Sequence, residues 1–159
     1  MALKAAMWVH GTAVSIEGSV EELTRSGNGV LIRGKSNATT WFHFPIATPV
    51  ILDGNRLRLV RVFAFYDTLP LTSIIDSMGP KLTNVRIFDG PNLVRSFDGL
   101  NFTGPHAKGI DGSNNWSISP PTEVFFGLSL SVAVHFPTTF SHEEQTILFT
   151  TAGADFEEA

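Results

Sequence analysis

Apolar and polar residues alternate along most of the chain with a period of two, which is the pattern of half-buried β-strands. The clearest example is residues 128–136, in which Leu, Leu, Val, Val and Phe alternate with Ser, Ser, Ala and His. A helical stripe with a period of about 3.6 residues is absent, although residues 19–25 or 71–78 could hold one helical turn. The pattern predicts strands over residues 8–16, 29–33, 39–46, 56–67, 82–89, 93–97, 123–136 and 146–151.

Clusters of Gly, Pro, Asn and Asp separate these strands and indicate tight turns. Short strands, Gly-rich turns and no long helix predict an all-β, single-domain β-sandwich that is jelly-roll-like, with a closed β-barrel as the alternative. We expect this domain to cover residues 1–154, and the acidic residues 155–159 to form a solvated C-terminal tail. The longest loop is expected over residues 102–121, and loops of that length in compact β domains often carry function.

The composition favours packing over the display of charge. Hydrophobic residues make up 43% of the 159-residue chain and charged residues only 16%, below the usual quarter or so. A chain of this length can bury one substantial core. The low charge is compatible with a large apolar interior or with the buried faces of a homo-oligomer, so a structural subunit of a homo-oligomer is one functional hypothesis.

Charge and cysteine content argue against several partners and chemistries. The net charge is −4 and no run of Lys or Arg occurs, so we expect neither nucleic acid nor an anionic membrane as a partner. A chain with no cysteine has no disulfide, thiolate ligand or cysteine nucleophile. The first residues lack the apolar stretch of a secretion signal, and no segment reaches the length of a membrane span, which predicts a cytoplasmic protein.

A Trp-x-His motif occurs twice, as Trp8 with His10 and as Trp41 with His43. Residues i and i+2 of a strand share a face, so both members of each pair point to one side of their strand. In a sandwich, residues 42 and 44, both Phe, would point to the core and leave Trp41 and His43 on the outer face or in a cavity. Residues 129, 131, 133 and 135 (Ser, Ser, Ala and His) form a similar small, polar face on another predicted strand.

The histidines suggest a metal hypothesis. If the strands that carry them are neighbours, His10, His43 and His135 could converge, and three imidazoles with an open position form a known zinc arrangement. None of the three has the close spacing of a strong metal motif. The alternative is that each histidine makes a structural hydrogen bond. We therefore expect no cofactor, with a divalent metal such as zinc as the alternative.

The tryptophans suggest a ligand-binding hypothesis. Trp8, Trp41 and Trp116 are the only three tryptophans, and an indole offers a flat apolar surface with an N–H donor, which suits a sugar ring or another flat molecule. The alternative is that all three fill the core. The leading hypothesis is a non-enzymatic module that binds a small ligand such as a carbohydrate. Its candidate site consists of Trp8, Trp41, His43, Arg61, His106, Trp116 and His135.

Arg61 lies in an apolar run and suggests the second functional hypothesis. A buried charge needs a partner, and an Arg–Asp pair near His43 would suit proton transfer or the orientation of a small carbonyl substrate. The protein would then be a small enzyme or metalloprotein with an apolar cavity lined by His and Arg. The simpler interpretation is a β-bulge near residue 60, where the apolar phase changes, that turns Arg61 to solvent. Because neither a G-x-S-x-G motif nor a phosphate-binding loop is present, an enzyme is not favoured.

Several short segments resemble those of a family of small bacterial all-β proteins with no assigned function. They are WVHG, WFHFPI followed by TPVILDG, DGP, FDGL, the loop with His106 and Trp116, FGLSLSV and FTTAGADF. The resemblance covers nearly the whole chain and implies a single β-sandwich or jelly-roll-like domain. It implies no catalytic residue, because the family has none assigned.

Overall fold

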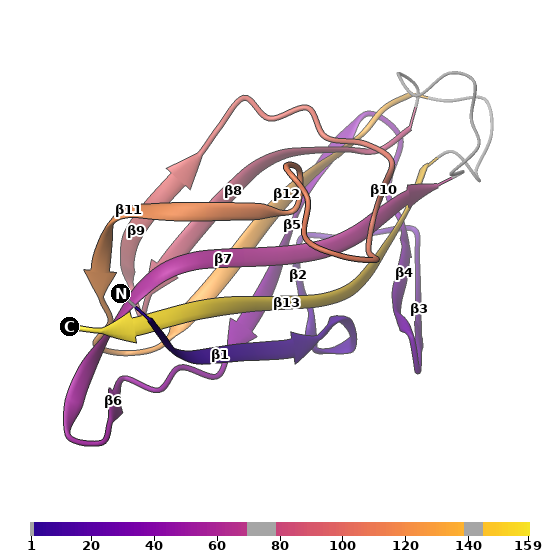
Figure 1. Ribbon diagram of the computed structural model, residues 1–159. Coiled ribbons are helices and arrows are strands. Elements are labelled where there is room, and N and C mark those ends of the chain that lie inside the picture. The colour runs from indigo at the N-terminus through magenta and orange to yellow at the C-terminus, as the bar shows by residue number, and fades with distance from the viewer. Residues whose placement is uncertain (1, 70–78, 139–144) are drawn as a thin grey trace.

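The strands form two antiparallel sheets that face each other in the computed structural model, which describes residues 2–69, 79–138 and 145–159 (Figure 1). The main path of the eight-stranded sheet has, in order, β10 (Pro105–His106), β7 (Asn55–Leu69), β13 (Thr146–Glu158), β4 (Gly29–Arg33) and β3 (Glu22–Ser26). Three further strands join this path: β1 (Leu3–His10) pairs with β13, and both β6 (Ile51–Leu52) and β11 (Asn115–Glu123) pair with β7. The five-stranded sheet has, in order, β2 (Ser15–Glu17), β5 (Ala38–Ile46), β12 (Leu128–Phe136), β8 (Lys81–Asp89) and β9 (Asn92–Phe97).

The predicted all-β sandwich is confirmed. The chain crosses repeatedly between the sheets, so the longest ladders join strands that are far apart in sequence, β5 with β12 and β7 with β13. This is the jelly-roll-like connectivity that the sequence predicted, and the sheets form two layers rather than one closed barrel. Both termini lie at the same end of the sandwich, because the start of β1 pairs with the end of β13 (Figure 1).

Side chains from the inner faces of both sheets fill one core. Phe42 and Phe44 of β5 are fully buried, and their ring centroids lie 5.2 and 5.3 Å from that of Phe149 in β13. Burial of one such side chain contributes about 1.5–3 kcal/mol. The period-two alternation of the sequence therefore decides which residues of β5 are left to face outward.

A bulge in β7 changes which residues face the core. Leu59 is buried before the bulge and Val62 after it, and the ladder with β13 skips Val60. One extra residue turns every later side chain to the opposite face. Arg61 consequently lies on the outer face of the eight-stranded sheet, and the bulge predicted near residue 60 is confirmed.

Several strand predictions need correction. The expected strand over residues 8–16 is interrupted by a 3-10 turn, η1 (Gly11–Ala13), which carries the chain from β1 in one sheet to β2 in the other. The expected loop over residues 102–121 contains β10 and most of β11, and the strand expected from residue 123 begins only at Leu128. Of the two candidate helical turns, the one at residues 19–25 is wrong for residues 22–25, which belong to β3. The other, at residues 71–78, lies outside the described residues. Within the described ranges, no helix is long and apolar enough to cross a membrane.

The prediction of a solvated acidic tail is wrong for residues 155–158. β13 continues to Glu158 and pairs there with both β1 and β7. Asp155 and Glu157 are buried, and each has an arginine of β7 as its partner, Arg61 at 2.8 Å and Arg58 at 3.1 Å. Acidic residues can occupy this strand because cations on the adjacent strand compensate their charge.

Candidate functional site

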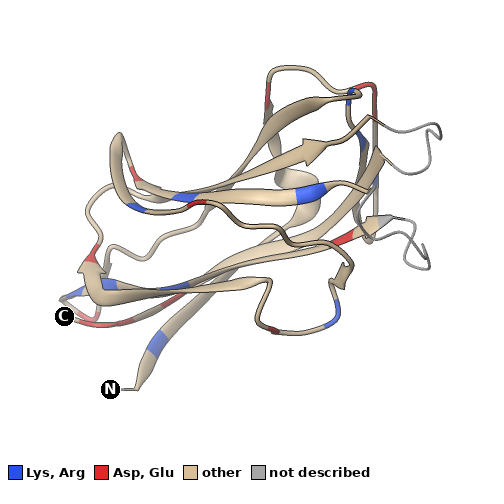
Figure 2. Ribbon diagram, turned by 90° about the horizontal axis from the view of Figure 1, so that it is seen from above, with Lys and Arg blue, Asp and Glu red and all other residues tan. Residues whose placement is uncertain are grey.

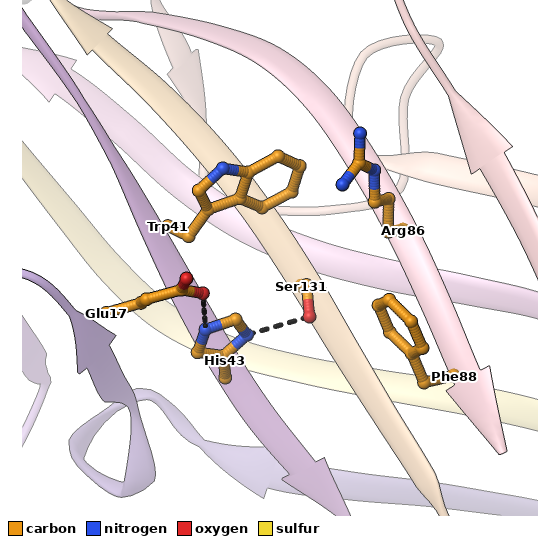
Figure 3. Close-up of a pocket in the computed structure, with 6 residues that line it drawn as sticks. All are labelled: Glu17, Trp41, His43, Arg86, Phe88 and Ser131. Atoms are coloured by element: carbon orange, nitrogen blue, oxygen red, sulfur yellow. Dashed lines mark hydrogen bonds and ion pairs between the residues drawn. The ribbon is translucent and has the colours of Figure 1, made fainter. Parts of the chain in front are cut away.

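An open hollow of about 140 Å³ lies on the outer face of the five-stranded sheet, and we call it the outer hollow. Trp41 and His43 of β5 reach it because the alternating phenylalanines of that strand face the core. The ladders place His43 opposite Ser131 of β12, and Ser131 opposite Arg86 of β8, so these three residues form one row across the sheet. The lining residues are Glu17, Trp41, His43, Arg86, Phe88 and Ser131 (Figure 3).

His43 joins Glu17 and Ser131 in a chain of hydrogen bonds across three strands (Figure 3). Its Nε2 lies 2.9 Å from Glu17 Oε2 and its Nδ1 lies 2.8 Å from Ser131 Oγ. In the neutral imidazole, Nε2–H donates to the carboxylate and Nδ1 accepts from the serine hydroxyl. The chain fixes the orientation of the ring and leaves the lone pairs of Ser131 Oγ available as acceptors.

Trp41 and Arg86 form the other side of the hollow. The Arg86 guanidinium carbon lies 4.8 Å from the centroid of the Trp41 ring, which is a cation–π contact. Asp98 lies close enough to Arg86 for their charges to interact, and its two oxygens accept hydrogen bonds from Asn84 and Ser96, each at 2.7 Å. These hydrogen bonds, with a smaller effect of the Arg86 charge, lower the pKa of Asp98. Within the described part of the chain, the Arg86 side chain itself forms no ion pair and no hydrogen bond.

The outer hollow combines flat apolar surface with polar groups of both kinds. Trp41 and Phe88 are half-buried rings, Arg86 supplies donors, and Glu17 and Ser131 supply acceptor oxygens. Such a set can bind a small molecule that has an apolar ring face and several polar substituents. A covalent reaction at Ser131 is less well supported, because its strand is paired on both sides and the backbone N–H groups there are used in the ladders.

The predicted convergence of three histidines is wrong. His10 ends β1 in the eight-stranded sheet, where its Nδ1 bonds to Thr12. His135 pairs with Thr39, which is four residues from His43 along β5, or about 13 Å at ~3.3 Å per residue. Across residues 2–69, 79–138 and 145–159, no group of three His, Asp, Glu or Cys side chains is arranged to hold a metal ion. The sequence hypothesis of a zinc site at these histidines is therefore not retained.

The structure separates the three tryptophans. Trp116 is only 6% exposed and belongs to the core, so it cannot contact a ligand at the surface. Trp8 is 44% exposed but lies on the outer face of the eight-stranded sheet, away from Trp41. Its ring stacks on Phe63 at 4.9 Å across Gly153, where an added Cβ would lie 2.6 Å from the indole. The two Trp-x-His motifs therefore belong to different sheets and do not form one site.

Arg61, His106 and His135 also lie outside the outer hollow. Arg61 pairs with Asp155 on the eight-stranded sheet. His106 lies in β10, where Nδ1 bonds to Asp111 and Nε2 to the Thr103 carbonyl, both at 2.7 Å. His135 shares the outer face of the five-stranded sheet with His43, and its Nδ1 bonds to Thr39.

Hydrogen bonds within the chain hold His106 of β10 together with Asp111 and Asn114 of the loop that follows it. The Asn114 side chain is fully buried and donates to the carbonyls of His106 and Gly109. Burial raises the pKa of the Asp111 carboxyl, but hydrogen bonds with His106 and from the Ser113 N–H outweigh that effect and leave the pKa below its ordinary value of 3.8. This network holds the loop in place against β7.

The candidate site predicted from the sequence lacked Glu17, Arg86 and Phe88, and Ser131 was named only as part of a small polar strand face. The alternation in residues 82–89 does place Arg86 and Phe88 on the same face of their strand. The order of the strands could not be predicted from the local pattern. Arg86 and Phe88 lie at the site because β8 pairs with β12. Glu17 enters because η1 moves the chain into the other sheet, and no local pattern predicted that turn.

The fold and the site define an antiparallel β-sandwich with an open aromatic and polar hollow on one outer face. The family model described as Family of unknown function (DUF6623) matches residues 2–136, and the chain belongs to this family. Comparison with curated proteins finds no match.

Proposed function

We propose that the protein is a non-enzymatic binding module whose ligand is a small carbohydrate held in the outer hollow. The observation that carries this proposal is the half-buried Trp41 ring beside a row of polar groups, His43, Ser131 and Arg86, on one sheet face. Sugar rings have apolar C–H faces that pack on indole, and hydroxyl groups that both donate and accept hydrogen bonds.

The site is well ordered for such a ligand before binding. The hydrogen bonds to Glu17 and Ser131 fix the His43 ring, and the contact with Arg86 holds the guanidinium beside Trp41. A site whose side chains are already held in place loses less conformational entropy on binding. The strands beneath it are rigidly paired, which also favours precise placement of the polar groups.

The test is isothermal titration calorimetry with glucose, galactose, mannose, N-acetylglucosamine and their short oligomers. Trp41→Ala removes the ring of the hollow, and Trp8→Ala removes an exposed tryptophan from the other sheet as a matched control. We expect Trp41→Ala to weaken binding at least tenfold, about 1.4 kcal/mol, and Trp8→Ala to leave it unchanged. Equal losses in both variants, or no binding of any sugar by the wild type, would contradict the proposal.

A second candidate function, hydrolysis of small esters, is favoured by one observation only. Glu17, His43 and Ser131 are connected in the order acid, imidazole, hydroxyl, and His43 Nδ1 is placed to take the serine proton. We rank it lower because the strand backbone offers no free N–H groups to stabilise an oxyanion. Hydrolysis of p-nitrophenyl acetate by the wild type that disappears in Ser131→Ala would favour this candidate over binding alone. Equal rates in both proteins would eliminate it.

A further inference from the structure

We infer that the ligand of the outer hollow is a sugar acid, whose carboxylate binds Arg86 while its ring packs on Trp41. This inference rests on the proposed function and narrows it from carbohydrates in general to uronic acids. It starts from the Arg86 guanidinium, which lines the hollow and whose hydrogen-bond donors have no acceptor in the described part of the chain.

The other arginines of the described residues each have a carboxylate or a carbonyl oxygen as a partner. Arg58 and Arg61 contact the buried carboxylates of Glu157 and Asp155, and Arg33 contacts Glu21 at 3.3 Å and Glu22 at 3.0 Å. Lys4 lies 3.5 Å from Asp53. Figure 2 shows basic and acidic residues interspersed along the ribbon. Arg56 also stacks on a ring, that of Phe125 at 4.2 Å, but it donates to the Val124 carbonyl as well. Arg86 differs because it contacts the Trp41 ring and its donors have no acceptor among the described residues.

The carboxylates near Arg86 are engaged by other groups. Both oxygens of Asp98 accept hydrogen bonds from Asn84 and Ser96. Glu17 is bonded to His43 on the far side of Ser131, as Figure 3 shows. The protein therefore holds these acids away from the guanidinium, and its planar fork of donors is left for an acceptor from outside.

The positions of Arg86 and Trp41 suit a sugar ring that carries a carboxylate group. An arginine fork binds a carboxylate through two parallel hydrogen bonds, which add geometric specificity to the charge attraction. Because the guanidinium lies 4.8 Å from the Trp41 ring, a carboxylate on Arg86 places the attached ring next to the indole and to Phe88. The lone pairs of Ser131 and Glu17 then face the side of the ring that carries hydroxyl groups.

The test compares each sugar acid with its neutral parent in calorimetric or NMR titrations: galacturonate with galactose, and glucuronate with glucose. Benzoate serves as a ring carboxylate without hydroxyl groups. The variants are Arg86→Gln, Arg86→Lys and, as a matched loss of one positive charge, Lys108→Gln in the exposed loop after β10. Circular dichroism and thermal unfolding of each variant check that the fold is retained.

We expect wild type and Lys108→Gln to bind at least one sugar acid about tenfold more tightly than its parent. Arg86→Gln should remove that preference, because it should weaken binding of the sugar acid about tenfold more than binding of the neutral parent, which loses only hydrogen bonds to uncharged hydroxyl groups. Arg86→Lys should recover only part of it, because an ammonium keeps the charge but lacks the fork. The preference should also fall as the salt concentration rises.

Four results would overturn the inference. Equal affinity for acid and parent would refute it and leave the carbohydrate proposal intact. A preference that persists in Arg86→Gln would assign the carboxylate to another group. Tighter binding of benzoate than of either sugar acid would replace sugar acids with aromatic acids as the ligand class. If neither acids nor neutral sugars bind, both the inference and the proposed function fail.

Discussion

Asp89 holds the connection between β11 and β12, and its replacement by asparagine should destabilise the protein strongly. The carboxylate is only 4% exposed. Its Oδ1 accepts from the N–H groups of Phe126 and Gly127 at 2.8 and 2.9 Å, and its Oδ2 accepts from that of Phe125 at 2.8 Å. The same turn is closed by a hydrogen bond from the Gly90 N–H to the Gly127 carbonyl, and both phenylalanines remain exposed.

The magnitude follows from this geometry. In Asp89→Asn the amide oxygen can replace Oδ1, but the amide nitrogen then faces the Phe125 N–H, so one donor loses its acceptor. Hydrogen bonds to charged groups contribute about 1.5–3 kcal/mol each, and an unsatisfied buried donor costs about 1–3 kcal/mol. We therefore expect a loss of about 2–4 kcal/mol in the free energy of unfolding. For a chain of this size that is a fall of about 5–15 °C in Tm.

Urea denaturation followed by circular dichroism measures this loss, with Asp98→Asn as the control. Asp98 also accepts two side-chain hydrogen bonds, but it is exposed, so its replacement should have a clearly smaller effect. If the two variants lose the same stability, or if Asp89→Asn is neutral, the assignment of Asp89 as the anchor of this turn is incorrect.

Three further predictions address other parts of the fold. Burial, and to a smaller extent the Asp111 carboxylate, raises the pKa of Tyr66 well above its ordinary value of 10.0. Since Tyr66 is the only tyrosine, absorbance at about 295 nm should show no tyrosinate at pH 10–11 until the chain unfolds, and a midpoint near pH 10 in the folded protein would refute this. Because the pKa of Asp111 is lowered in the folded protein, its contribution to stability is present above the ordinary value of 3.8 and is lost as the pH falls through the folded value. Asp111→Asn should therefore flatten the decline of Tm in acid, and an unchanged acid profile would contradict that expectation. Gly153→Ala places a Cβ 2.6 Å from the Trp8 indole and should cost about 1–3 kcal/mol in urea denaturation, whereas a change below about 0.5 kcal/mol would show that the indole moves freely.

Local periodicity was sufficient to predict the fold class and the faces of several strands. The phenylalanines of β5 face the core and Trp41 and His43 face outward, as the alternation of residues 39–46 predicts. The bulge near residue 60 could be predicted for the same reason, because one inserted residue shifts the apolar phase. These features depend on neighbours within one strand, and the sequence contains that information directly.

Features that depend on distant strands could not be predicted from local pattern. The grouping of His10 with His43 failed because η1 sends β1 and β2 into different sheets. The acidic end of the chain was expected in solvent because its arginine partners lie about 94–100 residues away in sequence. Arg86 reached the candidate site only through the ladder between β8 and β12. The homo-oligomer hypothesis stays a prediction.

A titration monitored by amide NMR would show whether the outer hollow binds the ligand. The protein would be labelled with ¹⁵N and titrated with galacturonate and with galactose, and the shifted amides would be mapped onto the two sheets. We expect saturable shifts centred on Trp41 and His43 in β5, Ser131 in β12 and Arg86 in β8, and none around Trp8 in β1. Shifts centred on Trp8 and β7, or no saturable shift with either sugar, would contradict this expectation.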